Sequence, residues 1–119
     1  QKNQRVQLTG QRESKYTSPM SKVKHIALLK FKEGTSTEHI DQLFDAIMDI
    51  TETIPGIEDY VAGTNCSPEG LSQGFTHGFI MTFTDAAARD AYLPHPEHEK
   101  VKSLILPKVD SVTVFDFEV

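Results

Sequence analysis

The sequence predicts an α+β domain in which helices cover one face of a four-stranded antiparallel sheet. The chain has 119 residues, 38% of them apolar, which suits one domain with a single core. Apolar residues recur in successive segments with the period of a strand or of a helix. The segments follow the order strand, helix, strand, strand, helix, strand, which is typical of a split βαβ or ferredoxin-like sheet.

The first predicted strand lies in the segment KVKHIALLKFK, from Lys22 to Lys32. Alternate residues from Val23 to Phe31 form one face, and His25 lies among them. The other face carries Ile26 and Leu28 between lysines. Because both faces are partly apolar, we expect helices to cover one side of the sheet and a second subunit to cover the other.

A helix and a short strand follow. Thr35 or Ser36 can cap the helix, and Glu38 near its start complements the helix dipole. Steps of three and four residues separate the members of its apolar stripe, which are Ile40, Leu43, Phe44, Ile47, Ile50 and Ile54. The dipeptide Pro55-Gly56 ends the helix, and a strand runs from about Ile57 to Gly63.

The second half of the domain begins with a loop rich in glycine and then a strand with an apolar face. The residues of that face are Phe75, His77, Phe79, Met81 and Phe83. Thr84 or Asp85 can cap an alanine-rich helix, which the prolines at 94 and 96 interrupt. A further helix is predicted from about Glu97 to Leu106, and a last strand from Val109 to Phe117.

Charge and composition exclude several classes of protein. The net charge of −5 would repel nucleic-acid phosphates and anionic lipid heads, so neither nucleic acid nor a membrane is an expected partner. No apolar run reaches the length of a membrane span. Cys66 is the single cysteine, which favours a reducing, cytoplasmic compartment. It lies in a polar loop without a nearby base, so we interpret it as a passive thiol.

Residues 1–19 differ from the rest of the chain. The segment is rich in glutamine, and its few apolar residues are scattered, so it has no face to bury. It also lacks the continuous apolar run of a secretory signal. We interpret it as a polar tail, whether a cloning remnant, a processed leader or a native extension, with Met20 as a candidate true start and the domain spanning 20–119.

Five residues form two candidate constellations for chemistry. His25 and His77 stand among apolar neighbours on the inward face of two predicted strands, either as hydrogen-bonded core histidines or as the lining of a cavity. Tyr92, His95 and His98 lie in AYLPHPEHEK, where prolines stiffen the backbone and hold acid–base groups in place. His98 can act as a base and Tyr92 as a hydrogen-bond donor, whereas His95 can instead cap the helix behind Pro96. The short spacing HPEH has no complementary ligands, so we predict no metal site.

Four segments, VKHIALLKF, GFTHGFIMTF, YLPHPEH and VFDFEV, occur in an order that resembles the stress-responsive dimeric α/β-barrel (Dabb) family over about residues 22–119. The resemblance implies a ferredoxin-like protomer whose sheet packs against that of a second copy, closing an α/β barrel. We therefore expect a homodimer, with Ile26, Leu28 and Val112 or Val114 on the covered face. Some structures of the family carry a cation near the end of the first helix, to which we assign no ligands here.

The family includes boiling-stable plant stress proteins, members without known activity and a plant polyketide cyclase. The tyrosine and histidine that act as acid and base in the cyclase match Tyr92 and His98, and two pocket histidines match His25 and His77. The resemblance implies a cofactor-free aldol closure of a poly-β-keto chain. This sequence has Ala62-Gly63 where the plant pattern has Trp-Gly, so the resemblance does not carry over the shape of the substrate.

Two hypotheses about function follow. The first is a stress-responsive homodimer whose histidine-lined pocket, with His25, His77 and His95, binds a small molecule without turnover. The alternative is a cyclase-like lyase or isomerase that uses Tyr92 and His98 as an acid–base pair without a cofactor. An open, partly apolar cavity beside these residues would favour the enzyme, and a closed core would weaken it.

Overall fold

A computed structural model describes residues 21–119, and its elements follow the predicted order. They are β1 (Val23–Phe31), α2 (Thr37–Thr53), β2 (Ile57–Thr64), β3 (His77–Phe83), α3 (Ala86–Tyr92), α4 (Pro96–Ile105), a 3-10 turn (Leu106–Lys108) and β4 (Val109–Glu118). The second helical region is split in two, as the prolines predict. The expectations for residues 1–19 and Met20 concern a part of the chain outside the described residues.

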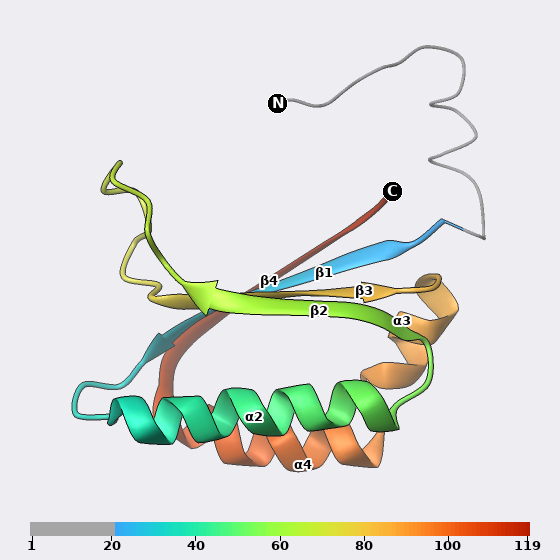
Figure 1. Cartoon of the computed structure of the whole chain (residues 1–119), viewed down its shortest axis with the longest axis horizontal. Coiled ribbons are helices and arrows are strands. Elements are labelled where there is room, and N and C mark those ends of the chain that lie inside the picture. Colours follow the sequence, from blue (N-terminus) through green and yellow to red (C-terminus); the bar gives the residue numbers. More distant parts are fainter. Residues whose placement is uncertain (1–20) are drawn as a thin grey trace.

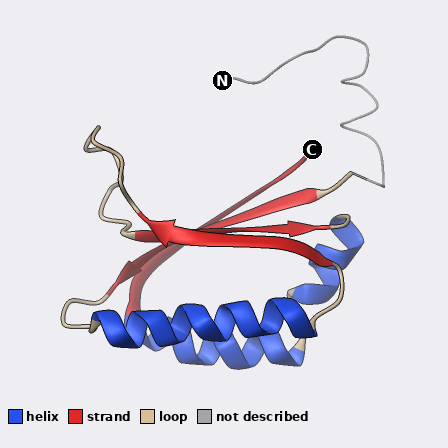
Figure 2. Ribbon diagram, in the orientation of Figure 1, coloured by secondary structure: helices blue, strands red, loops and turns tan. Residues whose placement is uncertain are grey.

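The four strands form one antiparallel sheet in the order β2-β3-β1-β4, which is the ferredoxin-like arrangement. Helices α2 and α4 lie side by side along one face of this sheet, and α3 lies at the end of the strands where β3 stops (Figures 1 and 2). The opposite face, called the outer face below, has no helix over it within the described residues. The predicted fold class is confirmed.

Local signals in the sequence set the limits of α2. The Ser36 hydroxyl caps the helix by accepting a hydrogen bond from the backbone N–H of His39. The apolar stripe faces the sheet and buries Ile40, Leu43, Ile47, Ile50 and Ile54. Gly56 turns the chain with a φ of 93°, which a residue with a side chain adopts only at a cost.

The segment between α3 and α4 places Tyr92 next to the start of α4. Asp85 caps α3 by accepting from the backbone N–H of Ala88. Leu93 ends α3, and Pro96 occupies the first turn of α4, where its missing N–H costs nothing. The prolines therefore make a short, stiff link between the last residue of one helix and the first turn of the next.

The pairing of β1 with β4 corrects one expectation. Residues paired directly across two strands point to the same side of a sheet. Val114 pairs with Ala27 and Val112 with Leu29, so both valines lie on the helix side, and their predicted place on the outer face is wrong. The strand is apolar at odd and even positions alike, so its pattern could not indicate which side faces inward.

The outer face carries an exposed apolar surface. Ile26 pairs with Ile80 on one side and with Phe115 on the other, which puts all three on this face. Phe115 is 63% exposed. The apolar side chains of the outer face are Ile26, Leu28, Val61, Ile80, Phe115 and Phe117.

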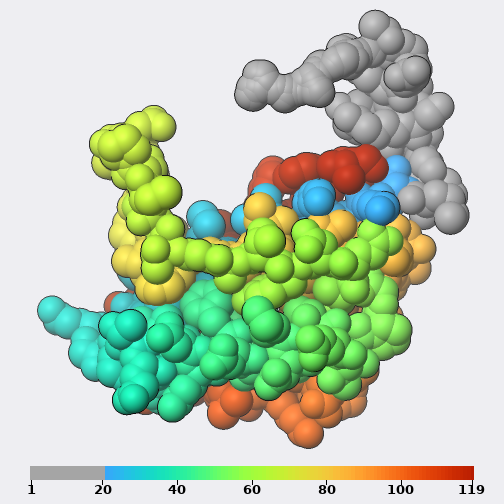
Figure 3. Space-filling model, viewed as in Figure 1, coloured from blue at the N-terminus to red at the C-terminus, as the bar shows by residue number. Residues whose placement is uncertain are grey.

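The strand β3 begins later than predicted. Its first residue is His77, although the alternation of apolar residues begins at Phe75. The backbone N–H of Phe75 donates to the carbonyl of Ser72 within the loop, so it is not available to a neighbouring strand. The loop 65–76 stands out from the sheet on the side away from α2 (Figure 3).

Candidate functional site

Three strands and two helices meet at a buried histidine, His25 of β1. It is 5% exposed. Its Nδ1 donates to a carboxylate oxygen of Asp116 on β4 at 2.7 Å, and the other oxygen of Asp116 accepts from Arg89 of α3 at 2.7 Å. Hydrogen bonding to Asp116 raises the pKa of the Arg89 guanidinium. The arrangement fixes the orientation of the His25 ring and leaves its Nε2 pointing away from the carboxylate.

Tyr92 and His98 form the second part of the site. Their ring centroids are 4.2 Å apart and the rings are inclined by 32°, while the ring of His25 lies 5.9 Å from that of Tyr92. Tyr92 is 2% exposed, whereas His98 is half-buried at the rim. The structure therefore brings Tyr92 and His98 together. We call His25, Tyr92 and His98 the histidine–tyrosine site.

The hydrogen bond of His98 determines which of its nitrogens is free. Nδ1 lies 2.8 Å from the carbonyl oxygen of Leu93. A carbonyl oxygen can only accept, so Nδ1 carries the proton and Nε2 of the neutral ring is an acceptor. Burial, assisted by the nearby charge of Lys102, lowers the pKa of His98, although the bond to Leu93 opposes the shift. The neutral form therefore dominates at pH 7.

Tyr92, unlike His98, keeps its proton and acts as a donor. Burial, with a smaller contribution from Tyr60, raises the pKa of the Tyr92 phenol well above its ordinary value of 10.0. The phenol therefore keeps its proton and can only donate or accept as a neutral hydroxyl. The site thus holds a donor, the Tyr92 hydroxyl, close to a basic nitrogen, Nε2 of His98, among the apolar rings of Phe79 and Phe83.

His95 lies in the same segment, but its side chain stabilises the start of α4 and does not join the site. It is the N-cap of α4, and its Nδ1 accepts from the backbone N–H of Glu97 at 3.1 Å. This is the helix-capping alternative that its position before Pro96 indicated.

His77 faces the same side of the sheet as His25 but lies apart from it. In the β1–β3 register His77 pairs with Leu29, while His25 pairs with Met81. Four residues along a strand correspond to about 13 Å, so the structure does not bring these imidazoles together. His77 instead packs against Phe31 and Phe44, and burial lowers its pKa, opposed by Asp41.

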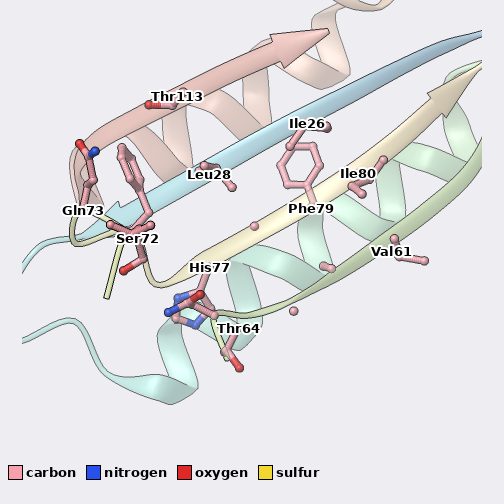
Figure 4. Close-up of a pocket in the computed structure, with 16 residues that line it drawn as sticks. Ile26, Leu28, Val61, Thr64, Ser72, Gln73, His77, Phe79, Ile80 and Thr113 are labelled. Carbon is pink, nitrogen blue, oxygen red and sulfur yellow. The ribbon is translucent and has the colours of Figure 1, made fainter. Parts of the chain in front are cut away.

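Cavities lie elsewhere among the described residues. The larger, about 690 Å³, lies between the outer face and the loop 65–76 (Figure 4). Its lining includes Ile26, Leu28, Ile80 and His77. A second, about 310 Å³, lies between α2 and β2 and includes Tyr60. Neither is lined by His25, Tyr92 or His98. The interior beside these three residues is therefore packed, which by the criterion set from the sequence weakens the enzyme hypothesis.

Asp116, Arg89 and Tyr60 were not among the candidates from the sequence. An acidic residue in the apolar strand VTVFDFEV was a signal for Asp116, because a carboxylate among apolar neighbours needs a partner. Tyr60 occupies an inward position of β2, where its hydroxyl also needs a partner. Arg89 gave no such signal, because a basic residue in an alanine-rich helix is usually solvated.

Two other features, a metal-ligand cluster and a membrane-spanning helix, do not occur within residues 21–119. No cluster of three or more histidine, cysteine, aspartate or glutamate side chains there could hold a metal ion. None of the helices in that range is both long and apolar enough to cross a membrane. Cys66 is an exposed free thiol in the loop after β2.

Curated relatives share most of this chain. The stress-response A/B barrel domain-containing protein HS1 of Arabidopsis thaliana is 34% identical over 96 residues, which cover 81% of this chain and 88% of HS1. Olivetolic acid cyclase of Cannabis sativa is 24% identical over 95 residues, which cover 80% of this chain and 94% of the cyclase.

Solved structures show the same fold. The hydroxynitrile lyase of Passiflora edulis has a TM-score of 0.79 at 23% identity, covering 85% of this chain and 95% of the lyase. A dimeric ferredoxin-like protein of unknown function from Jannaschia has a TM-score of 0.74 at 27% identity, covering 82% of this chain and 99% of that protein. The family model of the stress responsive A/B barrel domain matches residues 23–119. The chain therefore belongs to the stress responsive A/B barrel domain (Dabb) family.

Proposed function

We propose that this chain is a homodimeric stress-response A/B barrel protein that binds a small, uncharged carbonyl compound at the histidine–tyrosine site. The observation that carries the proposal is the pairing of Tyr92 and His98, with ring centroids 4.2 Å apart. One ring offers a hydroxyl donor and the other an unprotonated nitrogen. Few polar groups within an apolar lining are the usual composition of a small-molecule site.

The neighbouring charges support an uncharged ligand. Arg89 and Asp116 neutralise one another through an ion pair of 2.7 Å, so neither is left to bind a charged group. The rings of Phe79 and Phe83 pack against His25 beside the site. A charged ligand would have to lose its hydration there without gaining an ion pair, which is unfavourable.

The outer face supports the homodimer. Its apolar side chains, Ile80 and Phe115 among them, stay exposed in a single copy, and contiguous apolar patches on proteins mark interaction surfaces. The Jannaschia relative with the same fold is described as dimeric. We also propose a reducing, cytoplasmic location, which the free thiol of Cys66 supports.

A second candidate function is cofactor-free proton transfer, which the state of His98 favours. The Nδ1 proton of His98 is hydrogen-bonded to the Leu93 carbonyl, so Nε2 is free to accept a proton. The lowered pKa keeps the His98 ring neutral. Nε2 would take the proton of a methylene between two carbonyls as the C–H bond breaks. The electron pair would move to a carbonyl oxygen, and the Tyr92 hydroxyl would donate a hydrogen bond to that oxygen. Aldol closure of a poly-β-keto chain would then follow within the ligand, as the name of the Cannabis relative suggests.

Binding is tested with nonane-2,4-dione as the probe, by titration calorimetry at pH 7. Tyr92→Phe removes one donor, so we expect affinity to fall about three- to tenfold, the worth of one hydrogen bond. His98→Asn keeps a donor for the Leu93 carbonyl but removes Nε2, the acceptor for the enol hydroxyl of the dione, and we expect a similar loss. His39→Asn is the matched control, because His39 lies in the first turn of α2, outside the histidine–tyrosine site. Equal affinity in all four proteins, or no binding by the wild type, would contradict the proposal.

Proton transfer is tested separately with the same probe. In D₂O at low temperature, the wild type should speed deuterium uptake at the central carbon of nonane-2,4-dione above the buffer rate, followed by proton NMR. His98→Asn should return the rate to that of buffer, and His39→Asn should leave it unchanged. Binding without any acceleration would reject the enzyme and retain the binding protein.

A further inference from the structure

The hydroxyl oxygen of Tyr60, on β2, is a buried polar atom outside the histidine–tyrosine site. The hydroxyl is inaccessible to solvent and has no hydrogen-bond partner among the described residues. The ring of Tyr60, in contrast, is only partly buried and packs against the core. Buried tyrosine hydroxyls usually have a partner, so one without any calls for an explanation.

The strand register places Tyr60 in line with the histidine–tyrosine site. Tyr60 pairs with Met81, Met81 pairs with His25, and His25 pairs with Asp116. These four residues form one row across all four strands on the helix side of the sheet. Neighbouring strands are about 4.8 Å apart, so the backbones of Tyr60 and His25 are separated by only about 10 Å.

Aromatic rings connect Tyr60 to the site without interruption. Its ring centroid lies 5.7 Å from that of Phe79, which lies 6.1 Å from His25, and His25 lies 5.9 Å from Tyr92. Tyr60 is also near enough to Tyr92 to raise its pKa. The two phenols therefore flank one apolar region under α2 and α4.

Both phenols are donors at neutral pH. Burial, followed by the charge of Asp45, raises the pKa of Tyr60 to about 12. A hydroxyl that stays protonated can donate to a ligand oxygen but cannot act as a base. Phenylalanine would fill the same volume without a polar atom, so packing alone does not account for a tyrosine here.

We propose that Tyr60 is a ligand-binding residue of the histidine–tyrosine site and donates a hydrogen bond to a second oxygen of the ligand. This inference rests on the proposed function, and it narrows the ligand to compounds with two oxygen atoms on an apolar chain, such as β-diketones. The Tyr92 hydroxyl donates to one oxygen, and the Tyr60 hydroxyl donates to the other. A compound with a single carbonyl uses only the first of these two positions.

The test compares nonane-2,4-dione with nonan-2-one, which has the same chain and one oxygen fewer. Affinities are measured by titration calorimetry for the wild type, Tyr60→Phe and Tyr92→Phe. We expect Tyr60→Phe to weaken binding of the dione about three- to tenfold and to leave binding of nonan-2-one unchanged. Tyr92→Phe should weaken both. Because the Tyr60 hydroxyl is unpartnered without ligand, Tyr60→Phe should melt at the same temperature as the wild type or higher.

Three results would overturn the inference. If Tyr60→Phe lowers the melting temperature, the hydroxyl has a structural partner such as a bound water. If Tyr60→Phe binds both compounds like the wild type while Tyr92→Phe weakens both, the second donor is refuted and the proposed function stands. If neither compound binds the wild type, the proposed function fails, and the inference fails with it.

Discussion

Replacing Asp116 by asparagine should destabilise the fold, because Asp116 is the link between His25 and Arg89. Each of its carboxylate oxygens accepts one hydrogen bond of 2.7 Å, from Nδ1 of His25 and from the Arg89 guanidinium. Asparagine is nearly the same size but has one acceptor oxygen and an NH₂ group. With its oxygen turned toward Arg89, the amide presents its NH₂ to His25, whose Nδ1 can accept only in the other tautomer, and both bonds lose the negative charge of the carboxylate.

The structure indicates the size of the effect. The side chains of His25, Asp116 and Arg89 are only 7%, 21% and 24% exposed, so water replaces the lost charge poorly. Hydrogen bonds to charged groups contribute about 1.5–3 kcal/mol and neutral ones about 0.5–1.5 kcal/mol, so each of the two bonds becomes weaker by about 1–1.5 kcal/mol. We expect Asp116→Asn to lower the free energy of unfolding by about 2–4 kcal/mol. The melting temperature should fall by about 10–25 °C for a domain of this size.

Urea and thermal unfolding at a fixed protein concentration measure the loss, since dimerisation makes stability depend on concentration. Asp110→Asn is the matched control, because Asp110 is an exposed aspartate on the same strand. It should change the free energy of unfolding by less than about 0.5 kcal/mol. A loss of similar size for both variants would show that Asp116 behaves as a surface residue, and would refute the reasoning.

Three further predictions concern pH, a turn and the dimer. Burial lowers the pKa of His98 in the folded protein below its ordinary value of 6.5, so the unfolded chain binds the proton more readily. The stability that neutral His98 contributes is therefore lost as the pH falls from about 6.5 through the folded pKa. Urea unfolding between pH 7.5 and 5 should therefore show a steeper loss for the wild type than for His98→Asn, and equal slopes would contradict this. Gly56→Ala should cost about 2–3 kcal/mol in urea unfolding, because its φ is 93° and the new Cβ would lie 2.6 Å from that of Ala88. Gly34→Ala, with a φ of 89° and no atom within 4 Å of the new Cβ, should cost only about 1 kcal/mol, and an equal cost would disprove the crowding. Phe115→Glu on the outer face should shift the protein to monomers in sedimentation equilibrium, whereas Leu104→Glu on α4 should not; a dimer in both would place the interface elsewhere.

Most of the fold could be predicted from local patterns. Ser36, Pro55 and the apolar stripe of α2 define that helix in the sequence, because capping and periodicity act over a few residues. The side of β4 that faces the helices could not be predicted, because the strand has apolar residues on both of its faces, such as Val114 on one and Phe115 on the other. Only pairing with β1, more than 80 residues away along the chain, decides which side faces the helices.

The candidate site was predicted in part. Tyr92 and His98 are six residues apart in a stretch stiffened by prolines, so their proximity follows from local structure. The partners of His25 are distant in the sequence, and their positions depend on strand register and on the placement of α3. Strand register also separates His25 from His77, because both side chains face the helices but lie at different positions along the strands.

The central claim, that the histidine–tyrosine site binds a carbonyl compound, is tested most directly by NMR of the ¹⁵N-labelled histidine side chains. Nonane-2,4-dione is titrated into the protein at pH 7, and each ring is assigned with single histidine variants. We predict that the signals of His98 and His25 shift, while those of His39 and His95 stay in place. Shifts confined to His77 would place the ligand in the cavity of the outer face, and no shift in any signal would mean that the probe does not bind; either result would contradict the account.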